Sequence, residues 1–171
     1  VTPNKAEIGF GYIESENELD IKKINAEPIL RFIEKPDQAT AEKLILDKRF
    51  SWNSGIFLFK ASSFLNEALI YCSNIYELCE KSLLNIKLDL EFQRLDRETF
   101  ALCEKISIDK AIMEKTKKGV VLPLDAGWND IGNWESLWKV TSKNNYGNVE
   151  IGKVVTRDVK NSYIRSQEKL I

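Results

Sequence analysis

Three short polar segments hold side chains that could do chemistry, and the first is Glu34-Lys35-Pro36. It follows the largely apolar stretch 30–33, which predicts a strand, and Asp37 after it could begin a helix. A carboxylate and an ammonium therefore stand together at the carboxyl end of a strand, the edge at which open α/β sheets bind ligands. Adjacent opposite charges there suit a ligand with both hydroxyls and a phosphate. A surface ion pair before a loop is the alternative.

The second segment is 52–55, which precedes the apolar run Ile56–Phe59. Within it, the amide of Asn53 offers both a donor and an acceptor, which fits two neighbouring hydroxyls of a sugar. The alternative is a turn residue before a strand. Gly11, in the stretch 8–14, could let a sugar ring approach the backbone closely, or it could mark a bulge.

The third segment, 125–134, contains the carboxylates of Asp125 and Asp130 after an expected strand. Taken alone, Asp130 is typical of a turn residue or of a helix cap. The chain has no histidine, which excludes Ser-His and Cys-His nucleophilic pairs and removes the commonest general base. Chemistry in this chain must therefore depend on charge and positioning.

The elements that would position these segments are strands and helices in alternation, which predicts an α/β fold. Hydrophobic periodicity predicts strands at 8–14, 29–34, 56–60 and 120–124, and helices at 38–48, 63–81, from 107 and from 133. The unbroken run Ile56–Phe59 predicts a strand buried on both faces. Residues 83–103 predict helical pieces with charged faces, and 147–171 predicts short β segments separated by turns.

Composition excludes several function classes. The 171 residues include 25 Lys and Arg against 26 Asp and Glu, so no basic field supports nucleic-acid binding. The apolar runs are far shorter than the ~20 residues of a membrane helix, which predicts no membrane partner. Cys72, Cys79 and Cys103 lack the spacing of a zinc site or a disulfide framework. They predict reduced thiols in a soluble, cytoplasmic protein, with Cys72 and Cys79 as small core residues of helix 63–81.

Taken in order, these segments resemble bacterial mannose-1-phosphate guanylyltransferases, members of the sugar-phosphate nucleotidyltransferase superfamily. The resemblance covers nearly the whole chain and rests on Thr2-Pro3, Gly9 to Glu14, Phe32 to Pro36, Trp52 to Gly55, Ser107-Ile108-Asp109, Met113-Glu114-Lys115 and the segment around Asp130. It implies that residues 1–146 are the C-terminal, sugar-phosphate-binding part of a Rossmann-like nucleotidyltransferase domain, with a mixed sheet covered by helices. Residues 147–171 would be the truncated start of a left-handed β-helix.

The resemblance also implies a reaction, the Mg²⁺-dependent transfer of GMP from GTP to mannose 1-phosphate, which gives GDP-mannose and pyrophosphate. Two anions meet in this reaction, so cations and alignment are the main catalytic requirement. By resemblance, Lys35 neutralises the sugar phosphate and Asp130 is the Mg²⁺ ligand, so both are catalytic, and Asp125 competes for the metal role. The residues that would bind the sugar phosphate are Gly11, Glu34, Lys35 and Asn53.

One departure from the family bears on activity. Members of the family carry a glycine-rich, Arg- and Lys-containing phosphate loop near their start, and no such loop is found among these residues, which hold 8 glycines. We therefore expect a part of a longer enzyme, cut at both ends and inactive alone. One alternative is a non-catalytic sugar-phosphate or nucleotide-sugar binding module of the same fold. Another is an interaction domain whose apolar surface packs on a missing half or on a second copy in a homo-oligomer.

Overall fold

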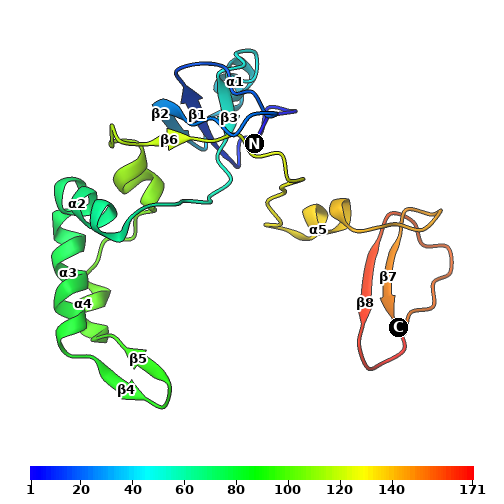
Figure 1. Cartoon of the computed structure of the whole chain (residues 1–171). Helices are drawn as coiled ribbons and strands as arrows, with labels where there is room; N and C mark the ends of the chain where they lie inside the picture. The colour runs from blue at the N-terminus through cyan, green and yellow to red at the C-terminus, as the bar shows by residue number, and fades with distance from the viewer. The chain divides into compact units, whose positions relative to one another are not determined.

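The computed structural model describes residues 1–171 and divides into two units, Val1–Asp125 and Ala126–Ile171. Both units combine helices with strands, as an α/β fold requires (Figure 1). The candidate sugar-phosphate residues belong to the first unit and Asp130 belongs to the second.

The framework of the first unit is a four-stranded sheet built from segments far apart in the sequence (Figure 1). In spatial order its strands are β3 (Phe50–Trp52), β1 (Gly11–Ser15), β2 (Glu27–Glu34) and β6 (Val120–Val121). All three pairings are antiparallel, so this sheet differs from the mixed sheet that the family resemblance implied. Strands β2 and β3 run parallel to each other, but β1 lies between them, so the two do not form a parallel pair. The carboxyl ends of β2 and β3 therefore lie at the edge where β1 begins.

Helix α1 (Gln38–Leu44) connects β2 to β3. Asp37 is its N-cap, as predicted, because its Oδ1 accepts the backbone N–H of Thr40 at 2.7 Å. This hydrogen bonding to Thr40 holds the pKa of Asp37 below its usual value. The predicted helix is confirmed, but it ends at Leu44 rather than at residue 48.

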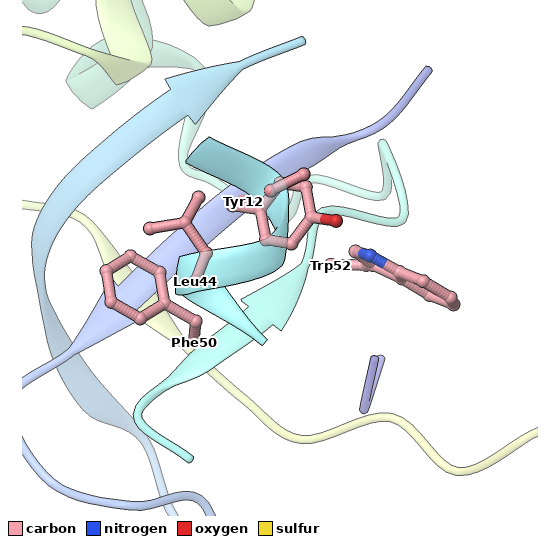
Figure 2. Packing of buried hydrophobic residues seen from close by; sticks show 5 residues of the cluster. Tyr12, Leu44, Phe50 and Trp52 are labelled. Carbon is pink, nitrogen blue, oxygen red and sulfur yellow. The ribbon is translucent and has the colours of Figure 1, made fainter. Parts of the chain in front are cut away.

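A cluster of buried side chains holds α1 on the sheet (Figure 2). Its members are Tyr12, Ala41, Leu44, Phe50 and Trp52. The hydroxyl of Tyr12 donates to the backbone carbonyl of Glu7 at 3.0 Å and accepts the N–H of the same residue at 2.9 Å, so burying this ring leaves no unpaired hydroxyl. Ile13 points to the opposite side of the strand and belongs to a second cluster with Phe32 and Val121.

The apolar run Ile56–Phe59 is the largest departure from the predicted fold. It forms no strand, and the side chains of Ile56 and Leu58 are 69% and 101% exposed. The prediction of a strand buried on both faces was wrong, because a strand needs a neighbour for its backbone hydrogen bonds. No strand of residues 1–171 pairs with this run.

The single helix predicted at 63–81 is two helices, α2 (Ala61–Tyr71) and α3 (Ser73–Leu84). They meet at Cys72, whose φ of −150° and ψ of 52° lie outside the helical region. Of the apolar side chains that give residues 63–81 a helical period, only Ala68 is buried. Cys72 and Cys79 are half-buried free thiols rather than core residues, since the break turns one continuous covering face into two.

The remainder of the first unit is made of short elements. They are β4 (Lys87–Asp89), β5 (Phe92–Arg94), α4 (Arg97–Ala101) and the π-helix η1 (Asp109–Met113). Residues 83–103 were predicted to form helical pieces. In the structure this segment also contains an antiparallel hairpin, in which β4 pairs with β5. In η1, Ala111 and Ile112 are buried against Ala68 of α2.

The second unit holds α5 (Trp134–Val140) and a parallel strand pair, β7 (Val149–Gly152) with β8 (Tyr163–Ser166). Asn133 caps α5 by accepting the backbone N–H of Ser136 at 2.8 Å, which confirms the predicted helix start. The two strands confirm the predicted β segments, whereas the β-helix and its boundary at residue 147 stay predictions. None of the helices has the length and apolar character needed to span a bilayer.

Candidate functional site

The beginning of β1 and the ends of β2 and β3 bring three of the predicted residues together. Gly11 is the register partner of Glu34 across β1 and β2. On the other side of β1, the backbone N–H of Asn53 donates to the carbonyl of Gly11 at 2.8 Å. An ideal Cβ on Gly11 would lie 2.7 Å from Glu34 Oε2 and 3.3 Å from the Cβ of Asn53. A side chain at position 11 would therefore displace the Glu34 carboxylate and crowd the Cβ of Asn53, whereas glycine leaves both in place.

Lys35 continues from Glu34 with an unusual backbone. Its φ is +49°, in the left-handed region that favours glycine, and it precedes Pro36, which disfavours helical conformations at the preceding residue. Its N–H donates to the carbonyl of Phe10 at 3.2 Å, which ties this bend to the start of β1. Its ammonium lies 2.7 Å from Glu34 Oε1. Backbone strain that the surrounding structure holds in place is found preferentially at ligand sites.

The charges of this pair are arranged asymmetrically. The side chain of Glu34 is 11% exposed, whereas that of Lys35 is 65% exposed. The carboxylate is therefore held at the end of the sheet, and the largely exposed ammonium donates to it. A phosphate could approach Lys35 from solvent while sugar hydroxyls donate to Glu34.

The amide of Asn53 has two partners. Its Nδ2 donates to Oδ1 of Asp109 at 3.1 Å, and its Oδ1 accepts the backbone N–H of Gly55 at 3.0 Å. Sequence reasoning did not select Asp109 for the site. The available signal was its place in the motif Ser107-Ile108-Asp109, but that motif was interpreted as a helix start.

Asp130 is exposed and precedes α5 in the second unit. In residues 1–171, no three His, Cys, Asp or Glu side chains are grouped so that they could hold a metal ion. A single exposed carboxylate nevertheless fits Mg²⁺, which keeps several waters and commonly takes one or two carboxylates together with substrate phosphates. The choice between Asp130 and Asp125 stays a prediction.

A cavity of about 550 Å³ lies beside the site in the first unit. Its lining is mainly apolar and comes from the run Ile56–Phe59, from β6 and from η1, with Asn53 among the lining residues. No sequence pattern indicated this cavity, because it exists where the predicted strand 56–60 fails to pack.

One buried carboxylate stabilises the wall of this cavity. Glu67, which is 7% exposed, accepts hydrogen bonds from the ammonium of Lys118 and the hydroxyl of Thr116, both at 2.6 Å. The bond from Lys118 contributes most to lowering the pKa of Glu67, and it raises the pKa of Lys118 in return. This group joins α2 to the segment before β6, and we assign it a structural role.

Comparison with known proteins identifies the family to which the chain belongs. Residues 1–146 match the family described as nucleotidyl transferase, and the chain belongs to that family. It is 43% identical over 176 residues to mannose-1-phosphate guanylyltransferase 2 of Escherichia coli O157:H7. It is 41% identical over 171 residues to the alginate biosynthesis protein AlgA of Pseudomonas syringae pv. tomato. These alignments cover 100% of this chain but 36% and 35% of the relatives, so the chain spans little more than a third of their length.

Solved structures give the same class of fold. A protein described as mannose-1-phosphate geranyltransferase from Thermus thermophilus has a TM-score of 0.67 and 27% identity, over 97% of this chain and 48% of that one. The mannose-6-phosphate isomerase from Helicobacter pylori has a TM-score of 0.65 and 33% identity, over 75% of this chain and 48% of that one.

Proposed function

We propose that this chain is the sugar-phosphate half of an enzyme that transfers GMP from GTP to mannose 1-phosphate. A phosphate oxygen of the sugar phosphate attacks the α-phosphorus of GTP, the bond from that phosphorus to the bridging oxygen breaks, and pyrophosphate leaves. The observation that carries the proposal is the meeting of Gly11, Glu34, Lys35 and Asn53 at one sheet edge. The similarity to mannose-1-phosphate guanylyltransferases supports this choice of substrates.

We assign each residue of this edge a role that is compatible with its position. Lys35 neutralises the phosphate of the sugar, so that this anion can approach the triphosphate. Glu34 accepts hydrogen bonds from sugar hydroxyls. Asn53 donates a hydrogen bond to one hydroxyl through its NH₂ group and accepts one from another through its carbonyl oxygen. Gly11 keeps the backbone open between them.

Asp130 is proposed to hold Mg²⁺, which when bound would neutralise charge on the reacting phosphates. The residues that bind GTP are proposed to lie outside this chain, since no glycine-rich phosphate loop is present in residues 1–171. Accordingly, the 171-residue chain alone should not form GDP-mannose.

The test is pyrophosphate release by the longest polypeptide that the gene encodes around this chain, with GTP, mannose 1-phosphate and Mg²⁺. The Lys35→Ala variant should lose about 100-fold or more in kcat/KM, because it removes a charge aimed at a reacting anion. Lys81→Ala is the matched control, since Lys81 also forms an exposed ion pair, with Glu77 on α3 at 3.6 Å. The control should retain full activity.

Two outcomes would contradict the proposal. Equal activity of the Lys35→Ala and Lys81→Ala variants would remove Lys35 from the site. Binding of mannose 1-phosphate without any GDP-mannose formation would instead favour the non-catalytic binding module of the same fold.

A further inference from the structure

We infer that Asp109 is a positioning residue that fixes the side-chain amide of Asn53 in one orientation for recognition of two neighbouring sugar hydroxyls. The inference rests on the proposed function and adds to it a residue from a distant segment. Asp109 itself touches Asn53 rather than the reacting phosphates, and its Oδ1 lies 3.1 Å from Nδ2 of Asn53.

The two partners of the Asn53 amide make its orientation unambiguous. An ionised carboxylate can only accept hydrogen bonds, so the atom that faces Asp109 must be the NH₂ group. A backbone N–H can only donate, so the atom that faces Gly55 must be the carbonyl oxygen. A rotation of the amide by half a turn would place donor against donor and acceptor against acceptor. Asp109 and Gly55 together therefore exclude the flipped state.

The position of Asp109 is itself fixed by packing on both sides of η1. Its backbone carbonyl accepts the N–H of Glu114 at 2.9 Å, the bond that defines the π-helical turn. Ala111 and Ile112 are buried against α2, and Met113 packs on the cluster of Ile13, Phe32 and Val121. The carboxylate therefore lies near the end of β3 on an element that packs against the rest of the unit. Such packing holds a functional side chain in one position.

What remains free on the Asn53 amide matches the proposed ligand. One of its two N–H donors and one carbonyl lone pair are taken by Asp109 and Gly55. One donor and one lone pair of the amide are left, and the Cβ of Asn53 lies near Gly11, which is the register partner of Glu34. A pair of neighbouring hydroxyls needs this combination, because one hydroxyl can accept while the other donates.

The same carboxylate has a second effect that the test must separate. An acidic residue in the first turn of a helix is stabilised by the positive end of the helix dipole. That effect requires the charge, whereas orienting Asn53 requires only an acceptor oxygen. Asp109→Asn keeps the oxygen and removes the charge, and Asp109→Ala removes both.

The first measurement is the side-chain NH₂ signal of Asn53 in an NMR spectrum of the 171-residue chain. In Asp109→Ala, the two NH₂ proton shifts should converge and their exchange with water should become faster. In Asp109→Asn and in the control Asp96→Ala, the signal should stay as in the wild type. Asp96 is a suitable control because it also accepts hydrogen bonds at a helix start, from Thr99. An unchanged Asn53 signal in Asp109→Ala would overturn the inference.

The second measurement is steady-state kinetics of the longest polypeptide encoded around this chain. Asp109→Ala should raise KM for mannose 1-phosphate about 5- to 10-fold, the range expected for one lost hydrogen bond, and leave KM for GTP unchanged. Asp109→Asn should restore it. Adding Asp109→Ala to Asn53→Ala should change KM no further, because the residue acts through Asn53. Additive effects of the two substitutions would contradict the inference.

The two failures can be told apart. A wild-type polypeptide that makes no GDP-mannose would refute the proposed function, whereas the NMR signal would still decide whether Asp109 orients Asn53. An active wild type whose KM is insensitive to Asp109→Ala would refute the inference alone.

Discussion

Two apolar regions of the first unit differ sharply in how far they are buried. The cluster around Tyr12 and Leu44 is packed between α1 and the sheet, and Leu44 is 7% exposed. The run Ile56–Phe59 is as hydrophobic, yet Leu58 is 101% exposed. The difference lies in the partners: β1 has a strand on each side, whereas no strand of this chain pairs with residues 56–60. An apolar pattern thus shows that a segment gains by burial, but it does not show what buries it.

The candidate site lies at the packed region. Glu34 and Asn53 are held by paired strands, and Gly11 is buried between them. The apolar cavity beside the site borders the unpaired region. We therefore expect substitutions to affect stability and ligand binding strongly at the packed region and weakly at the run 56–59.

The largest difference between the two regions should come from a leucine-to-alanine substitution made in each of them. Leu44→Ala should lower the free energy of unfolding by about 2–5 kcal/mol, because it leaves a cavity in a closed cluster. Leu58→Ala should change it by less than about 0.5 kcal/mol, because the side chain buries nothing in this chain. Denaturant unfolding of the two variants measures both values. A cost for Leu58→Ala comparable to that of Leu44→Ala would show that the run is packed.

A second change tests the crowding at the site. In Gly11→Ala the new Cβ would meet Glu34 Oε2 at 2.7 Å, so the carboxylate must move. We expect a loss of about 100-fold in kcat/KM, the order that misplacement by about an ångström can cause. Gly9→Ala is the control, since its Cβ would meet only Glu7 Oε1, at an ordinary 3.5 Å. Full activity of Gly11→Ala in the kinetic assay would contradict the assigned geometry.

The third and smallest effect concerns the polar group at the cavity wall. The hydrogen bond from Lys118 lowers the pKa of Glu67, so Glu67 contributes stability above the pKa that it has in the unfolded chain. This contribution is lost as the pH falls through its lower folded pKa. Conversely, the pKa of Lys118 is raised, so its contribution is present below its unfolded pKa and is lost as the pH rises through the folded one.

Glu67→Gln should therefore destabilise the chain at neutral pH, and the difference from the wild type should shrink below about pH 4. Thermal unfolding across this range measures the difference. Glu77→Gln is the control, because Glu77 forms an exposed pair with Lys81. A constant difference at all values of pH would indicate a packing effect of Glu67 rather than its charge.

The elements that local patterns specify were predicted from the sequence, whereas those that depend on distant neighbours were not. Glu34 could be placed at a strand end because the local pattern of residues 29–34 specifies β2. The cap at Asp37 is local as well. Asn53 was expected before a strand at 56–60, whereas it follows β3, which no local pattern indicated. The break at Cys72 and the exposure of Ile56–Phe59 depend on which neighbours are present, which no local pattern contains.

Asp109 is an example, at the candidate site, of a contact that local sequence patterns do not predict. It reaches Asn53 across 56 positions of the chain, and periodicity indicates only that its segment starts a helical turn. The contact depends on how η1 packs on α2 and on the second cluster, which is a tertiary property.

The most direct test of the site is an amide NMR titration of the 171-residue chain with mannose 1-phosphate at millimolar concentration. We predict shifts at Gly11, Lys35 and Asn53, no shifts at Ile56–Phe59, and much weaker shifts in Lys35→Ala. Shifts confined to Ile56–Phe59 and the cavity wall, or a wild type that shows none, would contradict a sugar-phosphate site at this sheet edge.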